Sequence, residues 1–430
     1  RVLALLSMGF RDLIDGSHVI EEPVSINFDI LEKSTSNNNV PMIFNNLEDC
    51  QGHRVAINIL TRSRLCESFG VNPGELIDIL AWAMENPSEP LIVDVTNAPV
   101  MENTMKEVDI RNLPIPWHYR EDGGRYQSSS IIIAQYGGVR NTSFHRQLIR
   151  SNNTTSVRLV PRHLRTMVES ARNDGQEVDI AVVNGPDPVV LLAAAMSFDE
   201  PLDELRVASA LHERLYGAAL EVFELPNGVI APTKSEYVME ARITMDTDEE
   251  GPYVDITGTV DDIRQEPVIE YDSIHHRNSP IFHALIPAGV EHMTLMGMPR
   301  APTIKTAVSK VVECKDVYLT EGGSGWLSSV VQIVPEKIGD GKRAIEAALD
   351  GHKSMKQVIV VDEDIDITDS TRVEWALMTR WQPDKDTIIL SDQKGSGLDP
   401  SRSPEGTTSK IGMDATIDPG TDRTPFESVL

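Results

Sequence analysis

The stretch Asn141-Thr-Ser-Phe-His-Arg146 places an amide, a hydroxyl, an imidazole and a guanidinium within six residues. It follows the apolar run at residues 131–134 and the turn Gly137-Gly138. A buried strand, a glycine turn and then a polar cluster is an arrangement in which sheet proteins carry chemistry. An edge strand with solvated polar side chains is the simpler interpretation, and one short motif does not exclude it. The rest of the sequence favours the first interpretation.

The composition excludes several classes of partner. The chain has 430 residues with 66 acidic and 39 basic side chains, a net charge of −27. Nucleic acids and anionic membranes both require basic faces, so we expect neither as a partner. The longest apolar run, residues 189–196, is too short to span a bilayer. Three scattered cysteines without a C-x-x-C pair indicate no disulfide framework or zinc cluster, and we expect a cytoplasmic protein.

The order of expected elements indicates three regions. Residues 1–115 mix short strands and helices and form a small α/β region. Residues 116–300 are rich in strands, with helices expected over 162–173 and 203–216, as in a barrel or sandwich with inserted helices. Residues 301–430 begin with a connecting helix, alternate strand and helix as an α/β domain does, and end in an extended tail.

Common catalytic motifs are missing from the sequence. It contains no G-x-G-x-x-G after a strand, no Walker lysine loop, no G-x-S-x-G and no H-E-x-x-H. A nicotinamide dehydrogenase, a P-loop enzyme and an ordinary serine hydrolase therefore lack their motifs here. The candidates that remain are three sets of polar residues in the strand-rich middle region.

The first set is Asn141, His163 and Glu204. An amide oxygen, an imidazole and a carboxylate suit a divalent ion such as Mn²⁺ or Mg²⁺. Their spacing along the chain has no diagnostic value, and each is also explained as a surface or capping residue. Glu204 is expected in the first turn of a helix, where a carboxylate stabilises the N-terminus without any metal.

The second set is Arg146, Glu250 and Asp255. The two acids surround a Gly-Pro turn that leads into a strand expected over residues 253–260. A guanidinium between acids can bind a substrate carboxylate, and an acid beside it can transfer a proton. A structural network of salt bridges is the alternative, and the residue types do not decide between the two.

The third set is Arg158, Arg162 and His163, at the start of the helix expected over residues 162–173. Basic side chains and a helix N-terminus both attract phosphate. Arginine is mostly exposed in proteins, so a solvated basic helix start explains the same residues.

Taken in order, these sets resemble a known family. Four motifs occur along the chain: Asn-x-Ser-x-x-Arg at 141–146, Arg-x-x-Pro-x-His at 158–163, Glu204, and Glu-Gly-Pro-x-x-Asp at 250–255. Further matching stretches lie at residues 276–285, 289–300, 361–366, 375–380 and 409–416. The ordered series resembles the UbiD family of reversible decarboxylases over nearly the whole chain, and most of all an archaeal branch that acts on anhydromevalonate phosphate.

The resemblance implies a fold and a set of bound groups. The fold is mixed α/β and β, with a central split β-barrel that binds flavin between an N-terminal α/β region and a C-terminal α/β oligomerisation domain. A linker helix near residues 303–312 and a dimer or hexamer are expected. The implied cofactor is prenylated FMN, supplied by a flavin prenyltransferase. Its phosphate is held through Mn²⁺ or Mg²⁺, in many members with K⁺.

The resemblance also implies roles for residues at matching positions. Asn141, His163 and Glu204 are the implied metal ligands. Asp255 is the implied proton donor, and Glu250 orients Arg146. The implied cofactor contacts are Phe144, His145, Arg146, Arg158, Leu159, Val160, Arg162 and His163.

The implied reaction is the non-oxidative decarboxylation of an α,β-unsaturated acid. The flavin accepts the charge left on carbon, and the protein positions the acid and delivers a proton. The substrate expected first is trans-anhydromevalonate 5-phosphate, which gives isopentenyl phosphate. An aromatic acid of the 4-hydroxybenzoate type is the alternative substrate, and a flavin-binding protein without catalysis is the alternative of another class.

Overall fold

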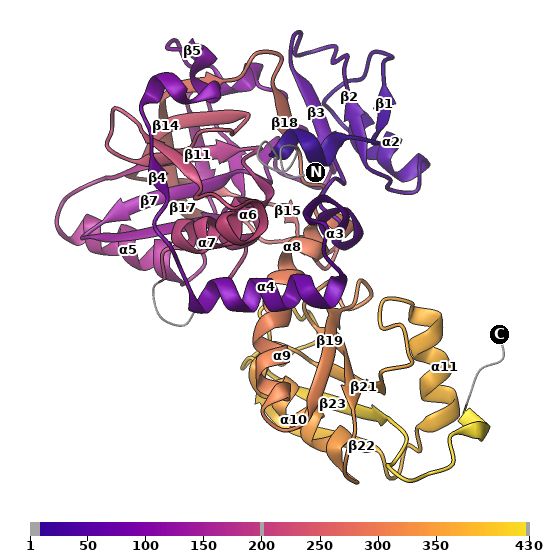
Figure 1. The fold of residues 1–430 in the computed structure, drawn as a ribbon. Helices are drawn as coiled ribbons and strands as arrows, with labels where there is room; N and C mark the ends of the chain where they lie inside the picture. The colour runs from indigo at the N-terminus through magenta and orange to yellow at the C-terminus, as the bar shows by residue number, and fades with distance from the viewer. Residues whose placement is uncertain (1–8, 198–201, 427–430) are drawn as a thin grey trace. The chain divides into compact units, whose positions relative to one another are not determined.

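The computed structural model describes residues 9–197 and 202–426, and the chain divides into two compact units (Figure 1). Unit 1 comprises Arg1–Phe69 and Ala83–His292, and unit 2 comprises Gly70–Trp82 and Met293–Leu430. The architecture confirms the expected mixture of α/β and β structure. None of the described helices is long and apolar enough to cross a membrane.

A nine-stranded sheet forms the centre of unit 1 among the described residues. Its order is β6 (Tyr126–Gln127), β9 (Gln147–Ile149), β10 (Thr154–Val157), β17 (Arg264–His276), β14 (Tyr237–Glu250), β11 (Val178–Asn184), β7 (Ile131–Tyr136) and β8 (Val139–Phe144), with β5 (Asn103–Met105) also paired to β17. All neighbours in it are antiparallel. The described strands form an open path, which fits the expected split barrel.

The long strands β14 and β17 position the second set of candidate residues. They pair from Tyr237 opposite His276 to Glu250 opposite Arg264. Because the two strands run antiparallel, the end of β14 lies beside the start of β17. Glu250 is therefore held at one end of the sheet by the longest strand pair in the described chain.

The prediction of one strand over residues 253–260 is wrong. β15 (Tyr253–Val254) and β16 (Val260–Asp261) are instead the two arms of a short antiparallel hairpin. Gly258, with φ of +73°, closes its turn, and the Gly258 N–H donates to Asp255 O at 2.8 Å. Glycine adopts positive φ without the steric cost that other residues incur, so the chain reverses here.

Two helices flank β8. α5 (His163–Asn173) and α7 (Glu204–Tyr216) both agree with the expected helices to within one residue. α5 packs on β7 and β8, and α7 packs on β8 and on α6 (Pro188–Ala194). His163 and Glu204 are the first residues of these two helices, and both helices pack on the strand that carries Asn141.

Unit 1 also contains smaller sheets. One has the order β1 (His18–Ile20), β2 (Met42–Phe44), β3 (Arg54–Ile57) and β18 (Ile281–His283), and another has β13 (Ile230–Pro232), β12 (Glu221–Glu224) and β4 (Leu91–Ile92). The helices α2 (Asp29–Ser36) and α3 (Arg62–Phe69) accompany the first of them in sequence, as an α/β region requires.

Unit 2 is a five-stranded α/β sheet. Its order is β19 (Glu313–Leu319), β20 (Ser328–Val334), β21 (Gln357–Asp362), β23 (Thr407–Ala415) and β22 (Thr387–Lys394). The remaining helices are α4 (Pro73–Glu85), α8 (Val290–Gly297), α9 (Ala301–Ser309), α10 (Asp340–Gly351) and α11 (Ser370–Arg380). Part of the expected tail forms β23 inside the sheet, between β21 and β22, and its residues Lys410, Gly412, Met413 and Ala415 are buried.

Candidate active site

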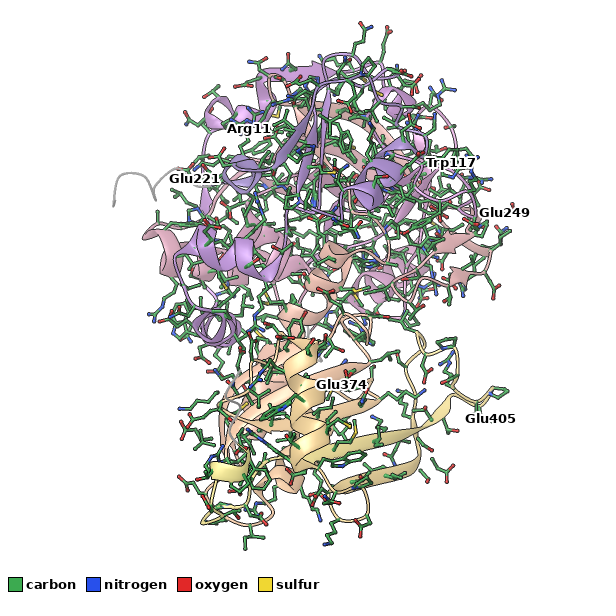
Figure 2. All side chains as sticks on the ribbon, turned by 90° about the vertical axis from the view of Figure 1, so that its right-hand side faces the viewer. Arg11, Trp117, Glu221, Glu249, Glu374 and Glu405 are labelled. Carbon is green, nitrogen blue, oxygen red and sulfur yellow. The ribbon has the colours of Figure 1, made fainter. Side chains whose placement is uncertain are left out.

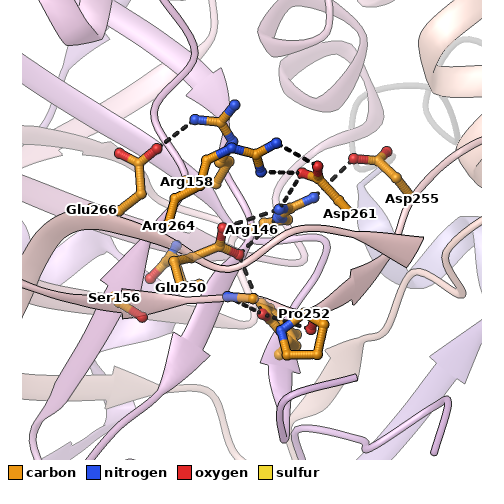
Figure 3. A network of polar contacts seen from close by, with 12 residues as sticks. Arg146, Ser156, Arg158, Glu250, Pro252, Asp255, Asp261, Arg264 and Glu266 are labelled. Atoms are coloured by element: carbon orange, nitrogen blue, oxygen red, sulfur yellow. Dashed lines mark hydrogen bonds and ion pairs between the residues drawn. The ribbon is translucent and has the colours of Figure 1, made fainter. Parts of the chain in front are cut away.

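Arg146 lies just after β8, at the centre of a cluster of acids (Figure 3). Its Nε donates to Glu250 Oε1 at 2.8 Å and its Nη2 to Glu250 Oε2 at 3.0 Å. Its Nη1 donates to Asp255 Oδ2 at 2.8 Å. The Glu250 side chain is fully buried and that of Arg146 is 9% exposed, whereas Asp255 keeps 27%. The tertiary structure thus brings together all three residues of the second set.

Burial and charge act in opposite directions on Arg146. Burial lowers the pKa of the guanidinium, but the hydrogen bonds and charge of Glu250, with the charge of Asp255, raise it by more. The net result is a pKa above the ordinary value, so Arg146 stays positively charged. Its central carbon also lies 4.4 Å from the centre of the Tyr253 ring, an attractive cation–π geometry.

Strand β14 aims Glu250 into this cluster. Successive side chains of a strand point to opposite faces, so the preceding residue, Glu249, is exposed at the surface (Figure 2). The Tyr126 hydroxyl lies 3.2 Å from both Glu250 Oε1 and Pro252 O, so its one proton can be donated to either acceptor. Burial raises the pKa of Tyr126 well above its usual range, so the hydroxyl keeps its proton. Glu250 is therefore held by Arg146, with a neutral hydroxyl within hydrogen-bond distance.

Two residues that the sequence analysis did not single out complete the cluster. Asp261, at the end of β16, accepts from Arg146 Nη2 at 2.8 Å. Arg264, at the start of β17, donates to both Asp261 oxygens at 2.6 and 2.7 Å. Burial raises the pKa of Asp261, but its bonds to the two arginines lower it below the usual range. Gly258 is the feature of the sequence that could have indicated this, because a turn at this glycine folds Asp261 back toward Asp255.

Asp122 supports the strand that leads to Asp255. Its Oδ1 accepts from the Val254 N–H at 2.8 Å, and its Oδ2 accepts from the Tyr119 N–H at 3.2 Å. The carboxyl is almost fully buried, and burial raises its pKa to about 6 despite these two bonds. Asp122 thus fixes the backbone of the residue next to Asp255.

The first set is brought together in part. Asn141 Nδ2 donates to Glu204 Oε1 at 3.0 Å, and the Thr142 N–H donates to Glu204 Oε2 at 2.7 Å. Burial raises the pKa of Glu204 to about 8. His163 is half-buried at the start of α5, and within the described residues it forms no hydrogen bond to Asn141 or Glu204. The described residues also contain no metal-holding group of three or more His, Cys, Asp or Glu.

The hydrogen bonds around Asn141 leave one acceptor without a proton. Ser143 Oγ lies 2.8 Å from both Asn141 Oδ1 and His145 Nε2. His145 Nδ1 lies 3.1 Å from the Arg158 carbonyl, so it carries the ring proton, and burial lowers the pKa of His145 to about 4. One hydroxyl proton cannot serve two acceptors. A cation at Asn141 Oδ1 would satisfy the second, so this donor set fits a metal ion.

The two segments expected to contact the cofactor lie side by side. The Arg158 N–H donates to Arg146 O at 3.1 Å, and the bond from His145 to Arg158 O joins the same segments. Phe144 is half-buried at the end of β8, and Leu159 is fully buried. Hydrogen bonds thus join residues that are more than ten apart in the sequence.

The basic residues of the third set differ in how they are held. Arg158 forms an ion pair with the buried Glu266, so its charge is balanced inside the protein. Arg162 is exposed at the N-cap of α5 and donates to Ser197 Oγ. Val160 exposes 40% of its apolar side chain. An exposed cation and an exposed apolar group near a helix N-terminus fit a ligand that carries phosphate.

Known proteins resemble this chain over most of its length. Residues 92–290 match the Rift-related domain of 3-octaprenyl-4-hydroxybenzoate carboxy-lyase, UbiD, and residues 293–415 match its C-terminal domain. The anhydromevalonate phosphate decarboxylase of Methanocaldococcus jannaschii is 41% identical over 378 residues, which cover 86% of this chain and 88% of that protein. That of Methanosarcina mazei is 40% identical over 420 residues, 95% of this chain and 96% of that protein.

A solved structure extends the comparison to the whole fold. The UbiD-class enzyme HmfF from Pelotomaculum thermopropionicum, solved in complex with FMN, superposes with a TM-score of 0.92 at 31% identity. The match covers 98% of this chain and 97% of that chain. The ordered motifs, the matching models of both domains and the shared fold lead to one conclusion: the chain belongs to the UbiD family of carboxy-lyases.

Proposed function

We propose that the protein removes CO₂ from an α,β-unsaturated acid with the help of prenylated FMN. We further propose that the acid is trans-anhydromevalonate 5-phosphate, which yields isopentenyl phosphate. The observation that carries the proposal is Arg146, held on one edge by Glu250 and bonded at 2.8 Å to the partly exposed Asp255. The anhydromevalonate phosphate decarboxylases that are 41% and 40% identical to this chain support the choice of substrate.

The geometry assigns each of the three residues a separate task. Glu250 takes the Nε–Nη2 edge of Arg146, which leaves Nη1, now bonded to Asp255, and one hydrogen of Nη2 for other partners. A substrate carboxylate bound to those atoms is held in one orientation for loss of CO₂. Asp255, whose side chain is 27% exposed and can take up a proton from water, then donates that proton to the carbon that carried the carboxylate. Arginine cannot donate a proton near neutral pH, so the donor in this cluster is an acid.

Prenylated FMN would supply the chemistry that side chains lack, because it takes up the charge that decarboxylation leaves on an sp² carbon. The segments 144–146 and 158–163, joined by the bonds of Arg158, would hold it. A flavin prenyltransferase would supply it. The FMN bound in the solved HmfF structure supports a flavin at this site.

A divalent cation, Mn²⁺ or Mg²⁺, would be held by Asn141, Glu204 and His163, with K⁺ close by. Two observations support this: Asn141 Oδ1 lacks a proton donor when Ser143 donates to His145, and the Glu204 carboxylate is buried. A cation there would balance the charge of Glu204 and attract the cofactor phosphate. The protein's own contribution is the pair of buried oxygen ligands.

A second candidate substrate is an aromatic acid of the 4-hydroxybenzoate type, which the name of the matching domain model favours. The test is to produce the protein together with a flavin prenyltransferase and to offer both acids. We expect a bound flavin with the spectrum and mass of the prenylated form, turnover of the phosphorylated acid, and a dimer or hexamer by light scattering. Turnover of the aromatic acid alone would reverse the order of the two substrates.

A flavin-binding protein without catalysis is the alternative of another class. Asp255→Asn separates the two, because it removes the proposed proton donor and leaves the segments that would bind flavin unchanged. We expect the variant to keep its flavin and to lose decarboxylation. Asp248→Asn, in an exposed ion pair with Arg150, is the control and should keep activity. Unchanged turnover in Asp255→Asn would contradict the proposed proton donor.

A further inference from the structure

The outer edge of Arg146 is already occupied by two acids. A guanidinium has five N–H groups. Nε and one hydrogen of Nη2 bond to Glu250, the other hydrogen of Nη2 bonds to Asp261, and one hydrogen of Nη1 bonds to Asp255. A substrate carboxylate that binds with both oxygens needs the Nη1–Nη2 edge, since Glu250 holds the other edge. Asp255 and Asp261 both accept from that edge now (Figure 3).

Asp261 has a second partner that would keep it paired without Arg146. Arg264 donates to both of its oxygens, and the Asp262 N–H donates to Oδ1 at 3.0 Å. Arg264 lies opposite Glu250 in the β14–β17 pair, so it is fixed at the end of a long strand. The Asp255 carboxylate, by comparison, accepts hydrogen bonds only from Arg146 and the Ile256 N–H among the contacts of the described residues.

The charges of the cluster also favour replacement of one acid on Arg146 by the substrate carboxylate. Two arginines, Arg146 and Arg264, face the carboxylates of Glu250, Asp255 and Asp261. A substrate carboxylate adds one more negative charge to a half-buried site, where repulsion between like charges is strong. The repulsion falls when one acid withdraws from Arg146 toward another cation, and Asp261 is the acid that has one.

We propose that Asp261 occupies, in the substrate-free protein, the position on Arg146 Nη2 that the substrate carboxylate takes. Arg264 is the positioning residue that holds Asp261 after this exchange. The inference rests on the proposed function in that it needs a carboxylate substrate at Arg146. It adds a competing acid and its holding arginine to the three residues already assigned.

The test is a cycle of variants measured by binding and by kinetics. The dissociation constant of trans-anhydromevalonate 5-phosphate is measured by calorimetry on protein loaded with FMN, and KM is measured on the enzyme with prenylated FMN. Asp261→Asn removes the competitor, so both constants should fall about threefold to fivefold. Arg264→Gln leaves Arg146 as the only arginine bonded to Asp261, so both constants should rise by a similar factor. Arg264→Lys, which keeps the charge but not the two-pronged bond, should lie between.

The double variant decides whether Arg264 acts through Asp261. In the Asp261→Asn background, Arg264→Gln should leave the dissociation constant nearly unchanged, because the acid that it holds is gone. Arg150→Gln is the matched control, since it removes an arginine from an aspartate pair that has no bond to Arg146. Thermal unfolding of each variant confirms that it is folded.

Two outcomes would overturn the inference. The first is an unchanged or weaker substrate affinity in Asp261→Asn. The second is an equal loss of substrate affinity when Arg264→Gln is introduced into the wild type and into Asp261→Asn, which would mean that Arg264 attracts the substrate directly. A wrong substrate has a different signature. If the wild-type protein binds 4-hydroxybenzoate and not the phosphorylated acid, the proposed substrate fails, and the same cycle measured with 4-hydroxybenzoate tests the exchange.

Discussion

Glu250 has no exposed surface. Its charge is balanced inside the protein by Arg146, and the neutral Tyr126 hydroxyl lies within hydrogen-bond distance of it. Removing one partner of a buried ion pair costs about 3–5 kcal/mol, but Arg146 would keep its other two acids. We therefore expect Glu250→Gln to lose about 2 kcal/mol of unfolding free energy, measured by urea denaturation. Asp248→Asn, which breaks an exposed pair, should lose less than about 1 kcal/mol. Equal losses would contradict the structural role of Glu250.

The raised pKa of Asp122 predicts how the unfolding free energy depends on pH. Its folded pKa of about 6 lies above the value of about 4 expected in the unfolded chain. The folded protein therefore keeps a proton there that the unfolded chain releases, so this residue's contribution to stability falls as pH rises from about 4 to about 6. In Asp122→Asn the dependence is gone. The unfolding free energy of the variant minus that of the wild type should rise by on the order of 2 kcal/mol over that range and then stay level. Unfolding free energies from urea denaturation that change in parallel with pH in the variant and the wild type would contradict this.

Among the elements, the turn between β14 and the β15–β16 hairpin brings the acids to Arg146. Gly251 has φ of +103°, and a Cβ there would lie 2.7 Å from Asp262 O. Gly251→Ala should therefore lose about 3 kcal/mol of stability and raise KM, because it adds a clash beside Asp261 to the backbone strain. Gly258→Ala meets nothing within 4 Å at a φ of +73° and should lose only about 1–2 kcal/mol. Urea denaturation and KM measurements on both variants test this, and similar results for the two would count against it.

At the scale of the whole molecule, unit 2 is assembled from two distant parts of the chain. Residues 70–82 belong with residues 293–430, and Lys305 Nζ bonds to Asp78 Oδ1 at 2.6 Å. Leu76 and Leu80 of the same helix are fully buried. A fragment of residues 293–430 should therefore be stabilised by a synthetic peptide of residues 70–85, with a rise in thermal midpoint that grows with peptide concentration. A scrambled peptide is the control, and an unchanged midpoint would show that the helix is dispensable.

The sequence by itself determined the features that depend on near neighbours along the chain. α5 and α7 follow from local helical periodicity, and both lie within one residue of their expected starts. The ordered motifs at 141–146, 158–163 and 250–255 likewise indicate the UbiD family without reference to any tertiary contact. The residue types alone group Arg146 with Glu250 and Asp255, because their chemistry fits a substrate carboxylate. The first two are nevertheless 104 positions apart in the sequence.

Only the tertiary structure decided which of these groups meet and what else joins them. Asp261 and Arg264 became part of the cluster through a hairpin at Gly258 and through the register of β14 on β17. The sequence likewise does not show that Asn141 and His145 compete for the single proton of Ser143. The physical reason is that strand pairing and register are set by burial of whole faces across the fold, which no local pattern encodes.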